Sequence, residues 1–137
     1  MLRLAQSKAV LKVVDDQHGA PTSARSIATV IVSLVSNMCA ADENDDRWGV
    51  YHFSGYPFTT WSCFADAIFY QAQKKRLINF IPEVVKISTS EYPTPAKRPA
   101  NSRLDCSKIL EVFGIEPDDW HTSLDEMLDE VQLESDS

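Results

Sequence analysis

Arg98 is the side chain whose type and setting most clearly suggest binding chemistry. It lies between Pro95 and Pro99, which restrict the backbone, so a side chain between them loses less entropy on binding. Arginine presents a planar fork of donors that suits two oxygens of a diphosphate. Asn101, close by, can donate to phosphate or ribose oxygens. From the residues alone two alternatives stay open: Arg98 pairs with surface acids, and Asn101 closes a turn.

Histidines and cysteines show no pattern for a metal site. The three histidines and three cysteines lie far apart, and neither set has metal-ligand spacing. His18 lies beside Asp15 and Asp16 and could ligate a cation, but nothing else completes such a site, which favours a hydrogen-bonded loop. An odd number of cysteines without a Cys-x-x-Cys pair argues against a disulfide framework and suits a reducing compartment.

We also expect the chain to lack the sequence motifs of enzymes that bind a cofactor and carry a complete active site by themselves. The four glycines form no Gly-x-Gly-x-x-Gly turn, so no such turn brings a helix N-terminus against a dinucleotide pyrophosphate. No P-loop, His-Glu-x-x-His or Gly-x-Ser-x-Gly motif occurs. We also expect no Tyr-x-x-x-Lys pair, the spacing that would place a phenol and an ammonium on one helix face for proton donation. The residues therefore predict neither a complete oxidoreductase, hydrolase or kinase nor a cofactor bound by this chain.

Length and charge describe one globular domain with an acidic end. The 137 residues, 44% hydrophobic and 24% charged, suffice for a packed core. Residues 109–137 hold ten acids and no lysine or arginine, whereas residues 1–108 carry a net charge of +3. No basic stripe with aromatic residues indicates nucleic-acid binding. No apolar stretch is long enough for a bilayer and the first residues do not resemble a signal peptide, so we expect a cytosolic protein.

The helices and strands that position Arg98 can be predicted from the spacing of apolar residues and from the positions of prolines and other turn residues. Because each proline forces its predecessor into extended geometry, the segment 92–99 cannot be helical. The alternation of elements predicts a mixed α/β layer structure. Strands are predicted over 10–14, 48–53 and 84–87, and helices over 23–35, 61–75, 105–113 and 123–131.

Two of these helices carry specific expectations about burial. The helix 23–35, capped by Thr22 or Ser23, is apolar nearly all round and should lie between two layers. Trp61 follows the N-cap Thr60 and belongs to an aromatic stripe at helical spacing, so it should pack in the core.

The last third of the chain carries clear helix-end signals. Asp105 should cap the helix 105–113, which Gly114 ends. Ser123 and Glu126 form a capping box for a final helix. Its inner face is expected to carry Leu124, Met127, Leu128 and Val131. We expect residues 134–137 to be a frayed acidic tail.

Four motifs occur in order and change the interpretation. They are Val14-Asp-Asp-Gln-His-Gly-Ala-Pro-Thr22, Gly49-Val-Tyr-His-Phe-Ser-Gly55, Thr59-Thr-Trp-Ser62, and Tyr92-Pro-Thr-Pro-Ala-Lys-Arg-Pro-Ala-Asn-Ser-Arg-Leu104 followed by Asp105-Cys-Ser-Lys108. Together they resemble the second half of the dTDP-4-dehydrorhamnose reductases, extended short-chain dehydrogenases/reductases. The resemblance covers about Leu2 to Val131, and four motifs in order make it strong.

The resemblance implies a fold and a function. Whole members reduce dTDP-4-dehydro-L-rhamnose to dTDP-L-rhamnose, a precursor of surface polysaccharide, with NADPH or NADH. Their first half holds the Rossmann fold, the cofactor and the Tyr/Lys pair, and their second half closes over the sugar nucleotide. Residues 1–133 are therefore expected to be the substrate-binding half. By analogy with related nucleotide-sugar enzymes Arg98 would meet the pyrophosphate, with Asn101 and Gln17 as further substrate contacts.

The resemblance also implies that Met1 corresponds to an internal methionine, so that the chain is a truncated, internal-start or excised product, catalytically silent alone. The strand 48–53 and the helix 23–35 look two-sided, as if meant to be covered by a missing half. Uncovered, they would expose an edge and an apolar patch, which predicts self-association.

Two other functions stay open. A regulatory subunit similar to the beta subunit of methionine adenosyltransferase would have a similar Arg-Pro and Leu-Asp-Cys-Ser-Lys pattern, although the run Tyr92–Ala96 favours the reductase. A decayed gene fragment without a present role is the third possibility. The sugar, the choice of NADPH or NADH, and any divalent metal in assembly are not decided by the sequence.

Overall fold

The computed structural model describes residues 1–135, with side chains described through Val131. Its sheets are small: β1 pairs with β4 in parallel register, from Val10 with Glu83 to Val14 with Ile87, and β2 pairs antiparallel with β3. In chain order the elements are α1 (Leu2–Ala5), β1 (Val10–Val14), β2 (His18–Gly19), α2 (Ala24–Met38), β3 (Thr59–Thr60), α3 (Trp61–Lys74), β4 (Glu83–Ile87), the 3-10 helix η1 (Thr89–Glu91), α4 (Ser107–Phe113) and α5 (Trp120–Ser135).

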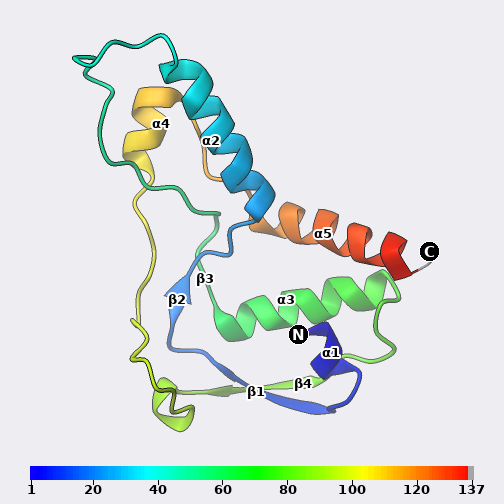
Figure 1. Cartoon of the computed structure of the whole chain (residues 1–137). Helices are drawn as coiled ribbons and strands as arrows, with labels where there is room; N and C mark the ends of the chain where they lie inside the picture. Colours follow the sequence, from blue (N-terminus) through cyan, green and yellow to red (C-terminus); the bar gives the residue numbers. More distant parts are fainter. Residues whose placement is uncertain (136–137) are drawn as a thin grey trace.

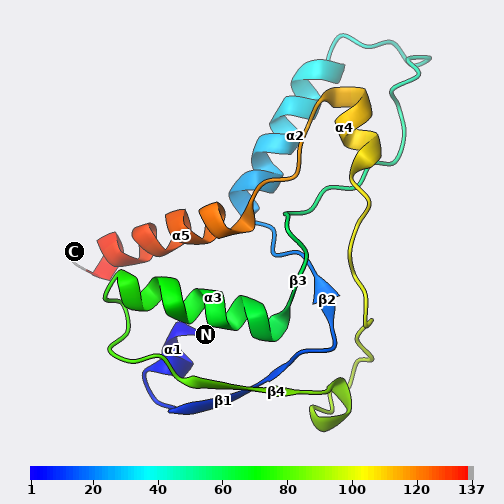
Figure 2. The ribbon, with the colours of Figure 1, turned by 180° about the vertical axis from the view of Figure 1, so that it is seen from behind.

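The elements form a layered base and a projecting arm. The β1–β4 ladder forms one layer, α3 lies over it with the short α1, and α5 lies over α3 (Figure 1). The helices α2 and α4 extend away from these layers as the arm, which the view from behind also shows (Figure 2). The mixed α/β architecture predicted from the sequence is confirmed.

The core lies between α3 and the elements on either side of it. Phe69, on α3, and Leu128, on α5, are completely buried, and small residues at helical spacing let α5 and the sheet approach α3 closely. The α3 residues Ala65, Ile68 and Ala72 pack with Leu11 of β1 and with Trp120 and Leu124 of α5.

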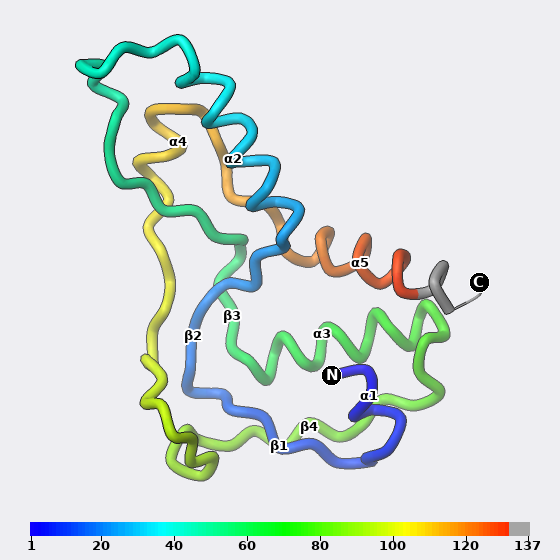
Figure 3. Tube along the Cα trace, in the orientation of Figure 1, coloured from blue at the N-terminus to red at the C-terminus, as the bar shows by residue number. Residues whose placement is uncertain are grey.

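The long irregular segments run along one side of the molecule. The chain leaves η1 and runs to α4 without regular structure, next to the segment that leads from the arm into β3 (Figure 3). Backbone bonds attach this stretch to β2, because His18 N donates to Ala100 O and Ser102 N donates to His18 O, each over 2.9 Å. The proline-rich segment is thereby held beside β2, and its non-helical prediction is confirmed.

Several end signals act as the sequence predicts. Ser23 caps α2 by accepting from Ser26 N, and Thr60 caps α3 by accepting from Cys63 N. Gly114, with φ of 66°, ends α4 in the left-handed conformation. At the start of α4, Asp105 accepts from Ser107 N over 2.9 Å, although Cys106 occupies the cap position.

The predicted strand 48–53 is wrong. The described structure gives this segment no ladder partner; instead Tyr51 packs edge-on against Phe113, with ring centroids 5.1 Å apart. The Tyr51 hydroxyl donates to Arg47 O over 2.6 Å, and Lys108 Nζ lies 4.4 Å above the Tyr51 ring. Side-chain contacts therefore hold this segment, because a β-branched and aromatic pattern forms a strand only beside another strand.

Helix α5 begins three residues before its predicted start. His121 N donates to the Asp119 carboxylate over 2.9 Å, so Asp119 supplies the helix start that the Ser123–Glu126 box was expected to provide. Met127 is 47% exposed rather than on the inner face. Of the predicted frayed tail, Glu134 and Ser135 belong to α5, and residues 136–137 lie outside the described residues.

The prediction that α2 lies between two layers is also wrong. Ser26 is its one buried residue, while Ile31, Val32 and Val35 are 54%, 65% and 61% exposed. These exposed side chains of α2 therefore form an apolar surface without cover in the described structure.

Candidate functional site

A hollow of about 450 Å³ lies where β1, α3 and the proline-rich segment meet. Val14 and Gln17 line it at the end of β1, Trp61 and Phe64 at the start of α3, and Arg98 on the proline-rich segment. The structure thus brings together Arg98 and Gln17, two of the three residues proposed from the sequence.

The end of β1 is fixed to α3 through Asp15. Its carboxylate accepts hydrogen bonds from the hydroxyls of Thr60, over 2.8 Å, and of Ser62, and it lies 3.5 Å from Lys86 Nζ. The Ser62 and Thr60 bonds, with a smaller contribution from Lys86, lower the pKa of Asp15. Because Asp15 is ionised near neutral pH, it makes charge-assisted bonds to both residues that flank Trp61.

A second acid–hydroxyl cluster fixes Gln17. The Asp16 carboxylate accepts from Thr89 Oγ1 over 2.6 Å and from Thr89 N, which lowers the pKa of Asp16. Gln17 Nε2 donates to Thr89 Oγ1 over 3.1 Å. With its nitrogen held there, Gln17 Oε1 receives no hydrogen bond within the described residues, so this oxygen can accept one from a ligand in the hollow.

Arg98 also lines the hollow, and its guanidinium is unpaired. The described part of the chain gives it no ion pair and no hydrogen bond, so the alternative in which it pairs with surface acids has no support in the structure. Thr94 Oγ1 donates to Ala96 O over 2.8 Å, which helps to fix the segment before Arg98. Arg98 thus contributes an unpaired guanidinium, on a restrained segment, to the lining of the hollow.

Asn101 is not brought to this hollow. Its carboxamide oxygen accepts from Arg103 N over 3.1 Å, and its backbone forms a bridge with His18. This geometry matches the turn-closing alternative, and the turn anchors the chain three residues after Arg98.

Trp61 is the site residue that the sequence analysis missed. It was expected in the core, but it is 57% exposed and lines the hollow. A helical side chain covers the turn that precedes its own Cα, and Trp61 opens α3, so no earlier turn lies beneath it. Its place directly after the cap Thr60 was the signal that could have revealed this.

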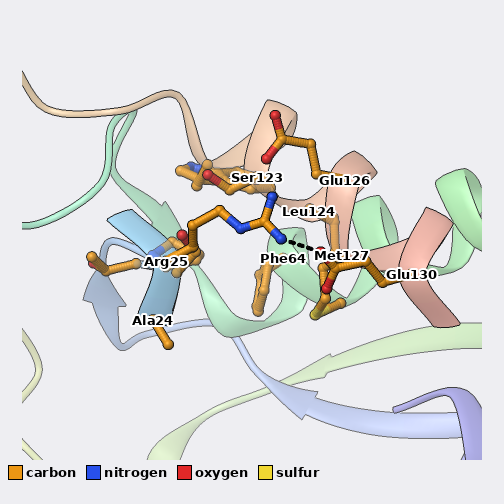
Figure 4. A pocket seen from close by; sticks show the side chains of 12 residues that line it. Ala24, Arg25, Phe64, Ser123, Leu124, Glu126, Met127 and Glu130 are labelled. Carbon is orange, nitrogen blue, oxygen red and sulfur yellow. Dashed lines mark hydrogen bonds and ion pairs between the residues drawn. The ribbon is translucent and has the colours of Figure 1, made fainter. Parts of the chain in front are cut away.

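A second hollow, of about 380 Å³, lies between the start of α2 and α5 (Figure 4). Arg25 on α2 reaches across it to form an ion pair with Glu130 on α5. Phe64 and Trp120, at right angles with centroids 5.3 Å apart, also line this hollow. Because its arginine is already paired, it offers a weaker anion site than the hollow at Arg98.

The expectation that the chain has no Tyr-x-x-x-Lys pair is wrong. Tyr70 and Lys74, both on α3, have this spacing. The ammonium of Lys74 lies 4.6 Å above the centre of the exposed Tyr70 ring, a cation–π contact, and neither residue lines the hollow at Arg98. The pair is therefore a surface contact away from the candidate site.

Comparisons with known proteins show the family of the chain. Residues 1–133 match the family described as the RmlD substrate binding domain. The chain belongs to this family. It is 44% identical over 124 residues to a dTDP-4-dehydrorhamnose reductase of Aggregatibacter actinomycetemcomitans, and 35% identical over 131 residues to one of Escherichia coli K12. These matches cover 90% and 96% of this chain but 42% and 43% of those proteins.

Solved structures of this family have the same fold. The dTDP-4-dehydrorhamnose reductase of Clostridium acetobutylicum superposes with a TM-score of 0.81 at 29% identity, over 96% of this chain and 42% of that one. The Bacillus anthracis reductase, solved in complex with NADP, gives 0.76 at 27% identity, over 94% and 41%. The resemblance stated from the motifs is confirmed, and the chain spans about two fifths of the length of these reductases.

The glycines of this chain serve its own packing and turns. A Cβ on Gly55 would lie 2.2 Å from Pro21 O, and one on Gly19 would lie 2.8 Å from Ser102 Oγ. Gly19 and Gly55 therefore permit close packing within the chain, and Gly114 ends a helix. Among the described residues there is no cluster of metal-ligating side chains and no helix long and apolar enough to cross a membrane.

Proposed function

We propose that this chain is the sugar-nucleotide-binding part of a dTDP-4-dehydrorhamnose reductase and that it binds the diphosphate of a dTDP-sugar through Arg98. The unpaired guanidinium of Arg98 on the wall of the 450 Å³ hollow carries this proposal. A diphosphate oxygen pair satisfies the fork of donors that no described carboxylate satisfies.

Gln17 and Asn101 contribute differently in this proposal. Gln17 offers its carboxamide oxygen to a donor on the ligand, since Thr89 holds its nitrogen. Asn101 acts as a positioning residue, because its bond to Arg103 N stabilises the turn that follows Arg98. Both roles are consistent with a preorganised binding site, which lowers the conformational entropy lost on binding.

We propose that the reduction requires a complementary polypeptide half. Hydride transfer needs a bound reduced dinucleotide and a proton donor facing the sugar. The Tyr70–Lys74 pair forms a cation–π contact on α3 and does not line the hollow at Arg98, which supports this proposal. We expect NADPH or NADH to be held by that other half. The chain alone therefore binds sugar nucleotide without oxidising NADPH.

The test is the affinity for dTDP of the wild type, Arg98→Ala and the neighbouring Lys97→Ala, which does not line the hollow. We expect Arg98→Ala to weaken binding about tenfold or more, since a charge-assisted pair contributes roughly 1.5–3 kcal/mol. Lys97→Ala should change the affinity by less than about threefold, because it only adds to the general positive field. Equal affinities for the wild type and Arg98→Ala would show that the diphosphate does not meet Arg98.

We also propose that the chain self-associates through α2. The predicted edge strand 48–53 does not exist, so the proposal rests on the apolar ridge of Ile27, Ile31 and Val35, which recur at every fourth position and are exposed. A contiguous apolar ridge is a common protein–protein contact. The cytosolic location and the regulatory-subunit alternative stay predictions; retrieval of a methionine adenosyltransferase in a pull-down would favour the latter.

A further inference from the structure

Trp61 differs from the other two tryptophans in how its indole is used. The Trp48 indole N–H donates to Asp42 O over 2.8 Å, and that of Trp120 donates to Pro57 O over 2.7 Å. The indole N–H of Trp61 makes no hydrogen bond within the described part of the chain. The residue is 57% exposed and lines the hollow. A large ring with a free donor is thus presented to whatever occupies the hollow.

This ring is presented on a rigid support. The residues on either side of Trp61, Thr60 and Ser62, both donate hydroxyl hydrogen bonds to the carboxylate of Asp15. Thr60 also caps α3, and the Phe64 ring lies 6.4 Å from the Trp61 ring. The backbone at Trp61 is therefore fixed to the end of β1, so little backbone entropy is lost when a ligand covers the indole.

We infer that Trp61 is the platform on which the planar base of the bound nucleotide stacks. This inference rests on the proposed function, since it places the base in the hollow that Arg98 also lines, where Arg98 binds the diphosphate. An indole face offers every planar base a favourable stacking surface, and a base gives an exposed indole the apolar cover that it lacks here. Trp61 would thus distinguish a nucleoside diphosphate from a bare diphosphate.

The experiment compares dTDP with inorganic pyrophosphate on the whole chain, by calorimetry or ligand-observed NMR. Trp61→Ala should weaken dTDP binding about tenfold to a hundredfold, the range of one base–aromatic stack, and leave pyrophosphate binding unchanged. Trp61→Phe, which keeps an aromatic face, should recover most of the affinity. Trp48→Ala is the matched control and should change neither affinity, because Trp48 lies on another loop.

Each outcome separates this inference from the proposal on which it rests. If Trp61→Ala binds dTDP as the wild type does, or the wild type binds pyrophosphate as tightly as dTDP, the stacking assignment is wrong while the role of Arg98 stands. If Trp61→Ala weakens a dTDP-sugar but not dTDP, the indole contacts the sugar instead. If the wild type binds neither dTDP nor pyrophosphate, both proposals fall.

A change in fluorescence gives an independent readout in folded protein. Because the exposed indole of Trp61 would be covered by the base, dTDP should quench emission in the wild type and in Trp48→Phe. It should not do so in Trp61→Phe. Quenching that persists in Trp61→Phe would overturn the inference.

Discussion

The carboxylate of Asp15 at the end of β1 accepts a hydrogen bond from the hydroxyl of Thr60, 2.8 Å away and 45 positions later in the chain. The same hydroxyl accepts from Cys63 N and so caps α3. One side chain thus joins the sheet to the start of the helix that carries Trp61, and the candidate site depends on this junction.

Asp15→Asn should lower the free energy of unfolding by about 1–2 kcal/mol at pH 7, because the charge-assisted character of two partly exposed hydrogen bonds is lost. The pKa of Asp15 is lower in the folded chain than its usual 3.8. Its charge therefore stabilises the fold above about pH 4, and this contribution disappears as the pH falls through the lowered pKa. Urea unfolding at a series of pH values measures the difference from the wild type.

Asp66→Asn is the control for this prediction, since Asp66 lies on the exposed side of α3 and makes no ion pair within the described residues. It should leave the free energy of unfolding nearly unchanged at every pH. The free energies of unfolding of the wild type and of Asp15→Asn could also differ by the same amount from pH 7 to below pH 3. That result would show that the charge of Asp15 does not contribute to stability.

Leu128→Ala should destabilise the chain by about 2–5 kcal/mol, because Leu128 is completely buried between α5 and α3 and its truncation leaves a cavity. The adjacent Met127 is 47% exposed, so Met127→Ala should cost less than about 1 kcal/mol. Chemical denaturation followed by circular dichroism measures both. Similar losses for the two variants would mean that α5 is rotated relative to the described structure.

Charges placed on the apolar ridge of α2 should abolish self-association. The double variant Ile31→Glu with Val35→Glu puts carboxylates at two exposed positions of the ridge, where burial against a second copy would cost several kcal/mol. Sedimentation velocity at tens of micromolar should show a dimer for the wild type and a monomer for the variant. Ser36→Glu, off the ridge, should remain dimeric, and a monomeric wild type would refute the proposal.

Local signals in the sequence were enough to predict much of the fold. The strand 10–14, the caps Ser23 and Thr60 and the helix end at Gly114 depend on a few neighbouring residues, and all are confirmed. The prediction of a strand over 48–53 was wrong because a strand depends on a partner elsewhere in the chain. The predicted start of α5 was wrong because Asp119, which precedes Ser123 in the chain, caps the helix.

The candidate site could be predicted only in part for the same reason. The chemistry of Arg98 and the motif containing Gln17 are visible locally, so both could be named. Arg98 and Gln17 line one hollow in part because Thr89, 72 positions after Gln17 in the chain, holds the Gln17 side chain. The exposure of Trp61 follows from its place directly after the cap Thr60, a signal that the periodic pattern of α3 alone does not contain.

The parallel ladder has a consequence for how quickly this chain reaches its native state. Val10 pairs with Glu83, 73 positions further along, so the loop between them must close before either strand gains a hydrogen bond. Helix α3 lies inside that loop and needs only local contacts to nucleate. Contacts so distant in sequence slow folding, and we expect the sheet to assemble late, after α3 has provided a surface on which the two strands meet.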